Sequence, residues 1–248
     1  MNRLFWDIET SPNIGFFWRS GYKLSIGPDN IIQERGIICI CYKWQGEDEI
    51  HSIQWDDGDD RRLVQTFAVI SGQADELVAH NGDKFDLKWF NGRNVMHGLD
   101  PLPDYKTFDT LAWSRRMFNF NSHKLDYLAD IFLGRKKIKT DFSLWKNIVL
   151  YNDKQAMKDM IKYCKRDVEL LEGVYDEILP YCKVKTHAGV AEGLGRWTCP
   201  ICASENVYTS KTRYTTMGML QHQMLCKDCH KYFTISDLVH RQYKESKM

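Results

Sequence analysis

The sequence has no hydrophobic run long enough to cross a bilayer, no internal repeat and no low-complexity tract. A membrane-spanning helix needs roughly 20 apolar residues, so we expect no membrane partner. The apolar stretch near the N-terminus is interrupted by Asp7 and Glu9, and we therefore expect no signal peptide. Together these absences predict a cytoplasmic protein.

The sequence also lacks a strong charge of either sign, with a formal net charge of +1 over 248 residues. Such a balance neither demands nor excludes a nucleic-acid partner, because basic patches can be local. Two stretches, 134–139 and 208–214, are locally basic. A solvated loop or edge strand explains each of them as well as a nucleic-acid contact does.

Half of the eight cysteines lie in the last fifth of the chain, as two CxxC pairs with 23 residues between them. In a cytoplasmic protein this spacing is typical of a tetrahedral structural zinc site rather than of disulfides. We predict a zinc ribbon that binds one Zn²⁺ and contains a β-hairpin over about 206–216 and 219–225. His222 and His230 are alternative ligands. The expected ligands are Cys199, Cys202, Cys226 and Cys229.

Before this module the chain alternates strand-like and helix-like segments, which predicts an α/β fold. The pattern indicates strands over 36–44, 49–55, 76–79 and 107–111, and helices over 59–70, 84–94, 124–133 and 154–179. Asp59 or Asp60 is a candidate helix cap. We expect four parts: a large domain over 1–185, a small-residue linker over 186–196, the zinc ribbon over 197–241 and a polar tail over 242–248.

Two carboxylates interrupt the first strand, in the segment Trp6-Asp7-Ile8-Glu9-Thr10. Side chains alternate along a strand, so Asp7 and Glu9 share one face, and Leu4, Trp6 and Ile8 share the other. Two like charges on one face of a core strand repel each other and lose hydration. They are tolerable when a cation lies between them.

Further acids are expected on apolar helix surfaces. Asp86 lies between Phe85 and Leu87, and Asp167 is the one charge on the apolar stripe of the long helix, a turn after Tyr163. A buried acid is costly unless it is paired or ligates a metal, and pairing with a basic residue is the alternative for Asp167. Asp109, by contrast, is interpreted as a cap or a structural hydrogen-bond acceptor.

If these elements converge, four carboxylates share one pocket, and four buried negative charges cannot coexist without cations. Hard oxygen ligands favour Mg²⁺ or Mn²⁺ over Zn²⁺. Two such ions, about 3.5–4 Å apart, form the arrangement used for in-line displacement at phosphorus. The residues themselves therefore indicate a two-metal site for phosphoryl transfer.

Three motifs in this order resemble the exonuclease motifs of the DEDD superfamily, in its tyrosine-containing branch. They are Asp7-Ile8-Glu9, the run from Asn81 to Phe85-Asp86, and Tyr163-x-x-x-Asp167. The last two are similar to those of B-family DNA polymerase proofreading domains, as is the stretch "HKLDYLADIFLG". The arrangement, with its zinc module, also resembles stand-alone exonuclease-like proteins of phages, whose location would be the host cytoplasm.

The resemblance covers about 3–180 and implies an RNase H-like fold, which is a mixed sheet flanked by helices. It also implies an activity that removes nucleotides from 3′ ends. It further implies that Tyr163 orients the attacking water and that Asn81 helps to position the substrate. One ion would activate the water and the other would stabilise the departing oxygen. The expected ligands of two Mg²⁺ or Mn²⁺ ions are Asp7, Glu9, Asp86 and Asp167.

The expected function is a metal-dependent 3′→5′ exonuclease on single-stranded DNA, in proofreading or another replication or repair task. Two alternatives stay open: the same chemistry on RNA, and a non-catalytic zinc-ribbon adaptor that binds nucleic acid. A chain of this length cannot contain a polymerase, so a proofreading role would require a separate polymerase or replication protein.

The role of the zinc module is open between three alternatives. It stabilises the C-terminus, docks a replication partner or grips nucleic acid. In the last case Lys211 and Arg213 would contact phosphates, and Tyr208 and Tyr214 would stack on bases. A module of about fifty residues would not fold stably without its metal.

Overall fold

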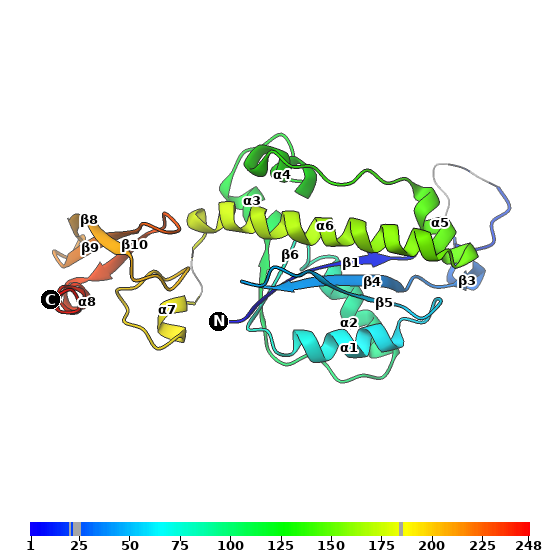
Figure 1. The fold of residues 1–248 in the computed structure, drawn as a ribbon, viewed down its shortest axis with the longest axis horizontal. Helices are drawn as coiled ribbons and strands as arrows, with labels where there is room; N and C mark the ends of the chain where they lie inside the picture. Colours follow the sequence, from blue (N-terminus) through cyan, green and yellow to red (C-terminus); the bar gives the residue numbers. More distant parts are fainter. Residues whose placement is uncertain (20, 22–25, 184–185) are drawn as a thin grey trace. The chain divides into compact units, whose positions relative to one another are not determined.

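The structure is a computed structural model that describes residues 1–19, 21, 26–183 and 186–248. The chain forms two compact units, which are described separately (Figure 1). The larger unit contains Asn2–Arg115 and Phe120–Val174, and the smaller contains Met1, Arg116–Asn119 and Tyr175–Met248. No helix in the described part of the chain combines the length and the apolar character that a bilayer span requires.

The larger unit is built on a five-stranded mixed sheet in the order β5-β4-β1-β6-β7. β1 pairs antiparallel with β4 and parallel with β6, so it lies at the centre of the sheet. The expected mixed sheet flanked by helices is therefore confirmed. The strands are β1 (Arg3–Thr10), β4 (Ile37–Trp44), β5 (His51–Gln54), β6 (Glu76–Ala79) and β7 (Lys106–Asp109).

Helices cover both faces of this sheet, with α1 and α2 on one side and α6 on the other (Figure 1). Gly134, with φ 63°, ends α4 in the left-handed conformation expected of a glycine cap. The helices are α1 (Arg61–Ser71), α2 (Asp86–Met96), α3 (Thr110–Met117), α4 (Leu125–Leu133), α5 (Phe142–Tyr151) and α6 (Lys154–Ile178).

The alternation of β1 divides the core from the polar face. Leu4, Trp6 and Ile8 are buried in one cluster with residues of α1 and α2. The Trp6 ring stacks on Phe67, with 4.9 Å between ring centroids, and meets Phe90 edge-on at 6.3 Å. Each such buried side chain contributes about 1.5–3 kcal/mol. The predicted division of the strand into two faces is confirmed, and it leaves Asp7 and Glu9 facing away from this cluster.

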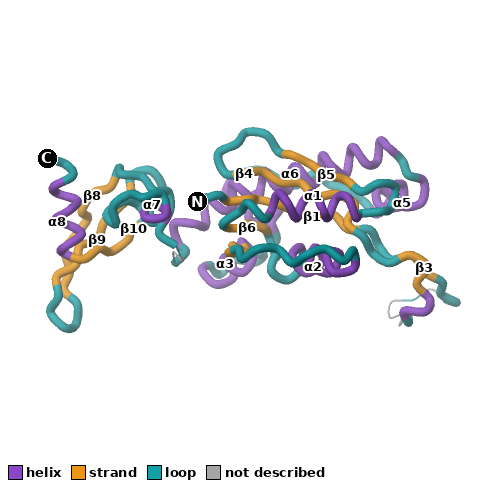
Figure 2. The backbone as a smooth tube through the Cα atoms, turned by 90° about the horizontal axis from the view of Figure 1, so that it is seen from below, coloured by secondary structure: helices purple, strands orange, loops and turns teal. Residues whose placement is uncertain are grey.

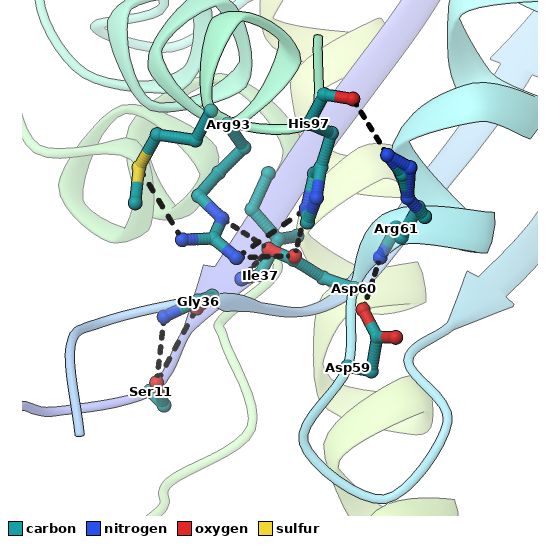
Figure 3. A network of polar contacts seen from close by, with 9 residues as sticks. Ser11, Gly36, Ile37, Asp59, Asp60, Arg61, Arg93 and His97 are labelled. Atoms are coloured by element: carbon teal, nitrogen blue, oxygen red, sulfur yellow. Dashed lines mark hydrogen bonds and ion pairs between the residues drawn. The ribbon is translucent and has the colours of Figure 1, made fainter.

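The start of α1 differs from the expectation for Asp60. This carboxylate does not cap the helix; it is fully buried and accepts a hydrogen bond from the backbone N–H of Ile37 at 2.9 Å. Arg93 and His97 of the α2 region donate to it as well (Figure 3). The first backbone N–H of α1 donates instead to Asp59, at 2.9 Å. The hydrogen bonds of Asp60 thus connect the start of α1 with α2 and β4.

The helix α5 and the strand pair β2–β3 are among the elements that have no counterpart in the sequence expectations. α5 begins with Asp141, whose side chain accepts from the backbone N–H of Ser143 at 2.7 Å, and it buries Ile148 alone of its residues. The short strands β2 (Ile14–Gly15) and β3 (Ile31–Gln33) pair antiparallel and are drawn apart from the main sheet (Figure 2). Neither element has the strong apolar periodicity on which sequence interpretation depends.

The smaller unit contains a three-stranded antiparallel sheet in the order β10-β9-β8, with α8 packed on it. The predicted hairpin is confirmed by the pairing of β8 with β9. The elements are α7 (Ala188–Ala191), β8 (Val207–Tyr214), β9 (Leu220–Cys226), β10 (Tyr232–Ser236) and α8 (Asp237–Glu245).

Part of the expected polar tail is ordered. Residues 242–245 continue α8, and Tyr243 packs on Trp197 with 5.6 Å between ring centroids. The Tyr243 hydroxyl donates a hydrogen bond to the Val207 carbonyl at 3.0 Å. Within the segment expected as a linker, α7 forms a single helical turn whose first N–H donates to Pro200.

Candidate active site

The polar face of β1 lies beneath α6. Asp7 pairs with Cys41 and Glu9 with Cys39 of β4, so the acids and these cysteines share one face of the sheet. Cys164 of α6 contacts Asp7 through its thiol, 3.5 Å from the backbone carbonyl and 3.6 Å from Oδ2. The long helix therefore crosses directly over the two acids of the strand.

Two further acids join Asp7 and Glu9. Oxygen atoms of Asp7, Glu9 and Asp167 all lie within 4.8 Å of one another. Asp86, the first residue of α2, accepts a hydrogen bond from the backbone N–H of Ile8 at 3.2 Å, which brings its carboxylate beside the same segment of β1. The four predicted acids thus converge from one strand and two helices.

Burial and mutual repulsion raise the pKa of these acids. The pKa of Asp7 lies well above its ordinary value, first because of desolvation and then because of Cys164 and the neighbouring carboxylates. The pKa of Glu9 is also raised well above its ordinary value, for similar reasons. Desolvation raises the pKa of Asp86 to about 7, against two opposing backbone hydrogen bonds. A cluster of this kind favours the binding of cations.

Lys137 is a cation at this site that sequence interpretation did not connect to the four acids. Its Nζ lies 2.5 Å from Asp167 Oδ2 and 5.6 Å from the centroid of the Tyr163 ring. Burial alone would lower the pKa of Lys137, but the charge of Asp167 and the hydrogen bond to it outweigh this and raise the pKa. The basic stretch 134–139 was the available signal, and the fold is needed to show which lysine enters the pocket.

Tyr163 lies on the same side of α6 as Asp167, one turn earlier. Burial raises the pKa of Asp167 overall, and Lys137 and, to a smaller extent, Tyr163 oppose this shift. The Tyr163 ring meets Trp145 of α5 edge-on, with 6.4 Å between centroids. Desolvation raises the pKa of Tyr163 to about 12, so its hydroxyl stays protonated at neutral pH.

Asn81 lies two residues after the end of β6 and adopts the left-handed conformation, with φ 68°. Its backbone N–H donates to Asp109 Oδ1 at 2.9 Å, and the same oxygen accepts from the N–H groups of Leu111 and Ala112. The interpretation of Asp109 as a cap is confirmed. Asn81 also borders a pocket that reaches Lys137 and is lined further by His80, Arg115, His123 and Lys124.

The carboxylate cluster fits hard divalent metal ions. Its donors are carboxylate oxygens, which Mg²⁺ and Mn²⁺ prefer. Asp167 Oδ1 is buried and has no hydrogen-bond partner among the described residues. A buried carboxylate oxygen without a partner is costly, and a metal ion would satisfy it. Asp7, Glu9, Asp86 and Asp167 are the residues able to provide ligands.

The four cysteines of the two CxxC pairs also converge, with all sulfur atoms within 4.8 Å of one another. Cys199 Sγ lies 3.5 Å from Cys229 Sγ, and Cys202 Sγ lies 3.6 Å from Cys226 Sγ. Zn–S bonds of about 2.3 Å at tetrahedral angles place sulfurs roughly 3.8 Å apart. The cluster is compatible with one structural Zn²⁺.

The other residues singled out in the smaller unit do not join this cluster. His222 Nε2 donates a hydrogen bond to Asp237 Oδ1 at 3.0 Å, and its ring stacks on His240 with 3.6 Å between ring centroids. His222 is not grouped with the four cysteine sulfurs, so it is no substitute ligand here. His230 is exposed and outside the group of converging ligand atoms. Lys211 and Arg213 are exposed on β8.

Comparison with known proteins places the larger unit in a family. The profile described as RNase_H superfamily matches residues 33–179. A curated relative, the DNA polymerase III PolC-type of Ureaplasma parvum serovar 3, is 39% identical over 67 residues. That match covers 27% of this chain and 4% of the relative.

A similar solved structure is that of the family B DNA polymerase from the archaeon Pyrobaculum calidifontis. The similarity has a TM-score of 0.55 at 18% sequence identity and covers 72% of this chain and 24% of the polymerase. The chain therefore corresponds to a small part of each of these polymerases. The expected RNase H-like fold is confirmed.

Proposed function

This chain belongs to the RNase H superfamily, and we propose that it is a divalent-metal-dependent nuclease that shortens single-stranded DNA from the 3′ end. The observation that carries the proposal is the convergence of Asp7, Glu9 and Asp167 within 4.8 Å, with Asp86 beside the same strand. Such a cluster has no structural benefit of its own, because buried like charges repel each other. Its benefit lies in binding metal ions.

We assign Asp7, Glu9, Asp86 and Asp167 as ligands of two Mg²⁺ or Mn²⁺ ions. When bound, such ions lower the pKa of water and stabilise charge on a departing oxygen. Of the two acids on β1, Asp7 lies farther from the end of the strand and is the candidate to bridge both ions. Glu9, nearer the end of the strand, is the candidate to contact one ion and the attacking water.

Tyr163 and Lys137 complete the proposed site. The protonated hydroxyl of Tyr163 can hold and orient the attacking water, because it lies one helical turn from Asp167. Lys137 holds Asp167 through a charged hydrogen bond of 2.5 Å, which fixes this side chain in the pocket. Lys137 can also stabilise negative charge on the reacting phosphate.

The substrate is proposed from the pocket beside the acids and from the polymerase relatives. His80, Asn81, Arg115, Lys124 and Lys137 line that pocket, and most of them can contact phosphate oxygens. Parts of two DNA polymerases resemble this chain, which supports DNA as the polymer and proofreading for a separate polymerase as the context. We propose 1–185 as the catalytic domain and 186–196 as the segment that joins it to the zinc ribbon. The ribbon, expected over 197–241, extends to Glu245, because α8 continues to that residue.

The test uses single-stranded DNA and RNA of one sequence, each labelled at the 5′ end, with and without Mg²⁺. We expect a ladder of one-nucleotide steps from DNA that disappears without Mg²⁺ and with Asp7→Ala. A ladder from RNA alone would move the proposal to RNA. No shortening of either polymer under Mg²⁺ or Mn²⁺ would refute the proposal. A second substrate carries its label at the 3′ end. If that label stays on the strand while nucleotides are lost from the 5′ end, the enzyme degrades in the 5′→3′ direction.

A further inference from the structure

The three-stranded sheet of the smaller unit has one covered face and one open face. Along β9, His222, Met224 and Cys226 are buried on the face that packs against α8. Gln221, Gln223 and Leu225 alternate with them and are partly exposed on the other face. Side chains paired across antiparallel strands point to the same face, so the register identifies every residue of the open face.

An extra residue in β8 determines what this open face presents. The register shifts between Thr209 and Lys211, which leaves Ser210 as the unpaired residue of a β-bulge. Tyr208 pairs with Leu225 and Lys211 with Gln223. Without the bulge, the period of two would put Tyr208 and Lys211 on opposite faces. The bulge instead places an aromatic ring and a cation side by side.

The open face therefore consists of three cross-strand rows. Tyrosines flank Leu225 in the first row, and the other two rows each carry one cation beside neutral polar groups. Successive same-face residues on a strand are about 6.7 Å apart. The rows are Tyr208–Leu225–Tyr232, Lys211–Gln223–Thr234 and Arg213–Gln221–Ser236.

A third cation lies at the aromatic end of this face. Lys227 Nζ is 5.5 Å from the centroid of the Tyr208 ring, and a shallow pocket lined by Tyr208, Leu225, Lys227 and His230 opens there. Tyr208 and Tyr232 are 40% and 50% exposed. The three rows contain no acid, and both oxygens of neighbouring Asp228 are held by Ser204 and Asn206.

We propose that this face, the open ribbon face, is a second nucleic-acid site that binds single strands without reading their sequence. Exposed rings offer surfaces on which any base can stack, and adjacent cations contact the backbone. The open ribbon face belongs to the smaller unit and the four carboxylates to the larger one, so strand binding by this face does not require the carboxylates. A double helix keeps its bases stacked internally and would leave the two tyrosines unused, so single strands are preferred. Tyr214 does not belong to the open ribbon face, because it pairs with Leu220 on the covered side.

The test measures binding of a labelled circular single-stranded DNA of about 40 nucleotides to the full-length, zinc-loaded protein. A circle has no 3′ end, so an exonuclease site cannot capture or digest it, and Asp7→Ala serves as a second safeguard. We expect Tyr208→Ala with Tyr232→Ala to weaken binding at least fivefold. Replacing Lys211, Arg213 and Lys227 by Gln should lower the slope of log affinity against log salt by about 2, since each phosphate contact on a single strand contributes about 0.7.

Matched controls replace similar groups away from the open ribbon face. Tyr214→Ala removes a more exposed tyrosine, 74% accessible, on the same strand, and Lys244→Gln removes a cation from α8. Both should bind the circle like the parent protein. Zinc content near one per chain in every variant shows that the smaller unit has folded.

Three results would overturn the inference: no binding of the circle by the folded parent protein, equal effects of the control and face variants, or tighter binding of duplex than of single strands. A matched RNA oligonucleotide shows whether the 2′-hydroxyl matters. A small chromogenic phosphodiester reports the carboxylate site alone. If the parent protein fails to hydrolyse it, the proposed function is in doubt, and circle binding still decides the present inference.

Discussion

Lys137 and Asp167 form an ion pair inside the carboxylate cluster, with Nζ 2.5 Å from Oδ2, and the aspartate side chain is only 3% exposed. The cation comes from the loop between α4 and α5, thirty residues before its partner. In the described residues it is the one lysine or arginine that an ion pair links to the four acids. It therefore balances part of the negative charge of the cluster.

Lys137→Met should lower the rate at saturating Mg²⁺ by about 10- to 100-fold, which corresponds to the loss of one charged hydrogen bond of about 1.5–3 kcal/mol. Half-maximal activity should need less Mg²⁺, because the competing cation is gone. The measurement is a Mg²⁺ titration of initial rates. Lys136→Met is the control, since Lys136 is largely exposed and pairs with Asp130. Unchanged kinetics in the Lys137 variant would remove this residue from the site.

Tyr163→Phe should reduce kcat by roughly 10- to 100-fold with little change in KM, because in the proposed mechanism the hydroxyl orients the attacking water and does not bind the substrate. Steady-state kinetics on a short single strand measure both constants. Tyr151→Phe on α5 is the matched control, as Tyr151 is 74% exposed. A change confined to KM would instead indicate that Tyr163 contacts the substrate.

Asp7→Asn should abolish activity, by about a thousandfold or more, and raise the melting temperature by about 2–4 °C when no Mg²⁺ is added, because it removes one of four mutually repelling carboxylates. Added Mg²⁺ should stabilise the parent protein more than the variant. Thermal unfolding with and without Mg²⁺ tests both statements. A lower melting temperature without Mg²⁺ would show that Asp7 has a structural role in the metal-free protein.

Asp60→Asn should destabilise the larger unit by about 3–5 kcal/mol, because it leaves the partly buried Arg93 without its counter-charge. Burial of Asp60 raises its pKa, but the hydrogen bonds from Arg93, the Ile37 N–H and His97 together outweigh this and lower it. A depressed pKa contributes stability above the unfolded value of about 3.9, and this contribution is lost as pH falls through the folded pKa. The parent protein should therefore lose stability below about pH 4 more steeply than the variant does, as measured by urea unfolding across that range.

Cys226→Ser should lose the zinc and unfold the smaller unit, because a closed four-thiolate site supplies folding free energy directly. Elemental analysis should find about one zinc per chain in the parent protein and in Asp7→Ala. Freshly purified parent protein without zinc would contradict the zinc-ribbon assignment.

The features that could be predicted from the sequence are those that a regular spacing of apolar residues or a glycine marks. The faces of β1, the extent of α6 and the glycine end of α4 follow from the spacing of residues such as Trp6, Asp167 and Gly134, and all three are present in the structure. The cost of burying charge made the convergence of the acids a hypothesis, and the structure brings them together. These are local or energetic arguments that need no knowledge of tertiary contacts.

Other features depend on contacts between distant segments. Asp60 has the sequence setting of a cap, yet Arg93 and His97, more than thirty residues away, determine its conformation. Lys137 is one of several adjacent basic residues, and only the fold selects it. The bulge at Ser210 changes which residues share a face of β8, and nothing in the local pattern marks an extra residue.

The division of β1 into two faces has a consequence for how this protein tolerates sequence change. A deletion of one residue within Leu4–Ile8 would exchange the faces. Trp6 would then point toward α6, and a carboxylate would enter the space between Phe67 and Phe90. A substitution in this strand can weaken the core or the carboxylate cluster by a small or a large amount. An insertion or deletion of odd length disrupts both at once. Across related chains we therefore expect length variation to be confined to the loops that flank β1.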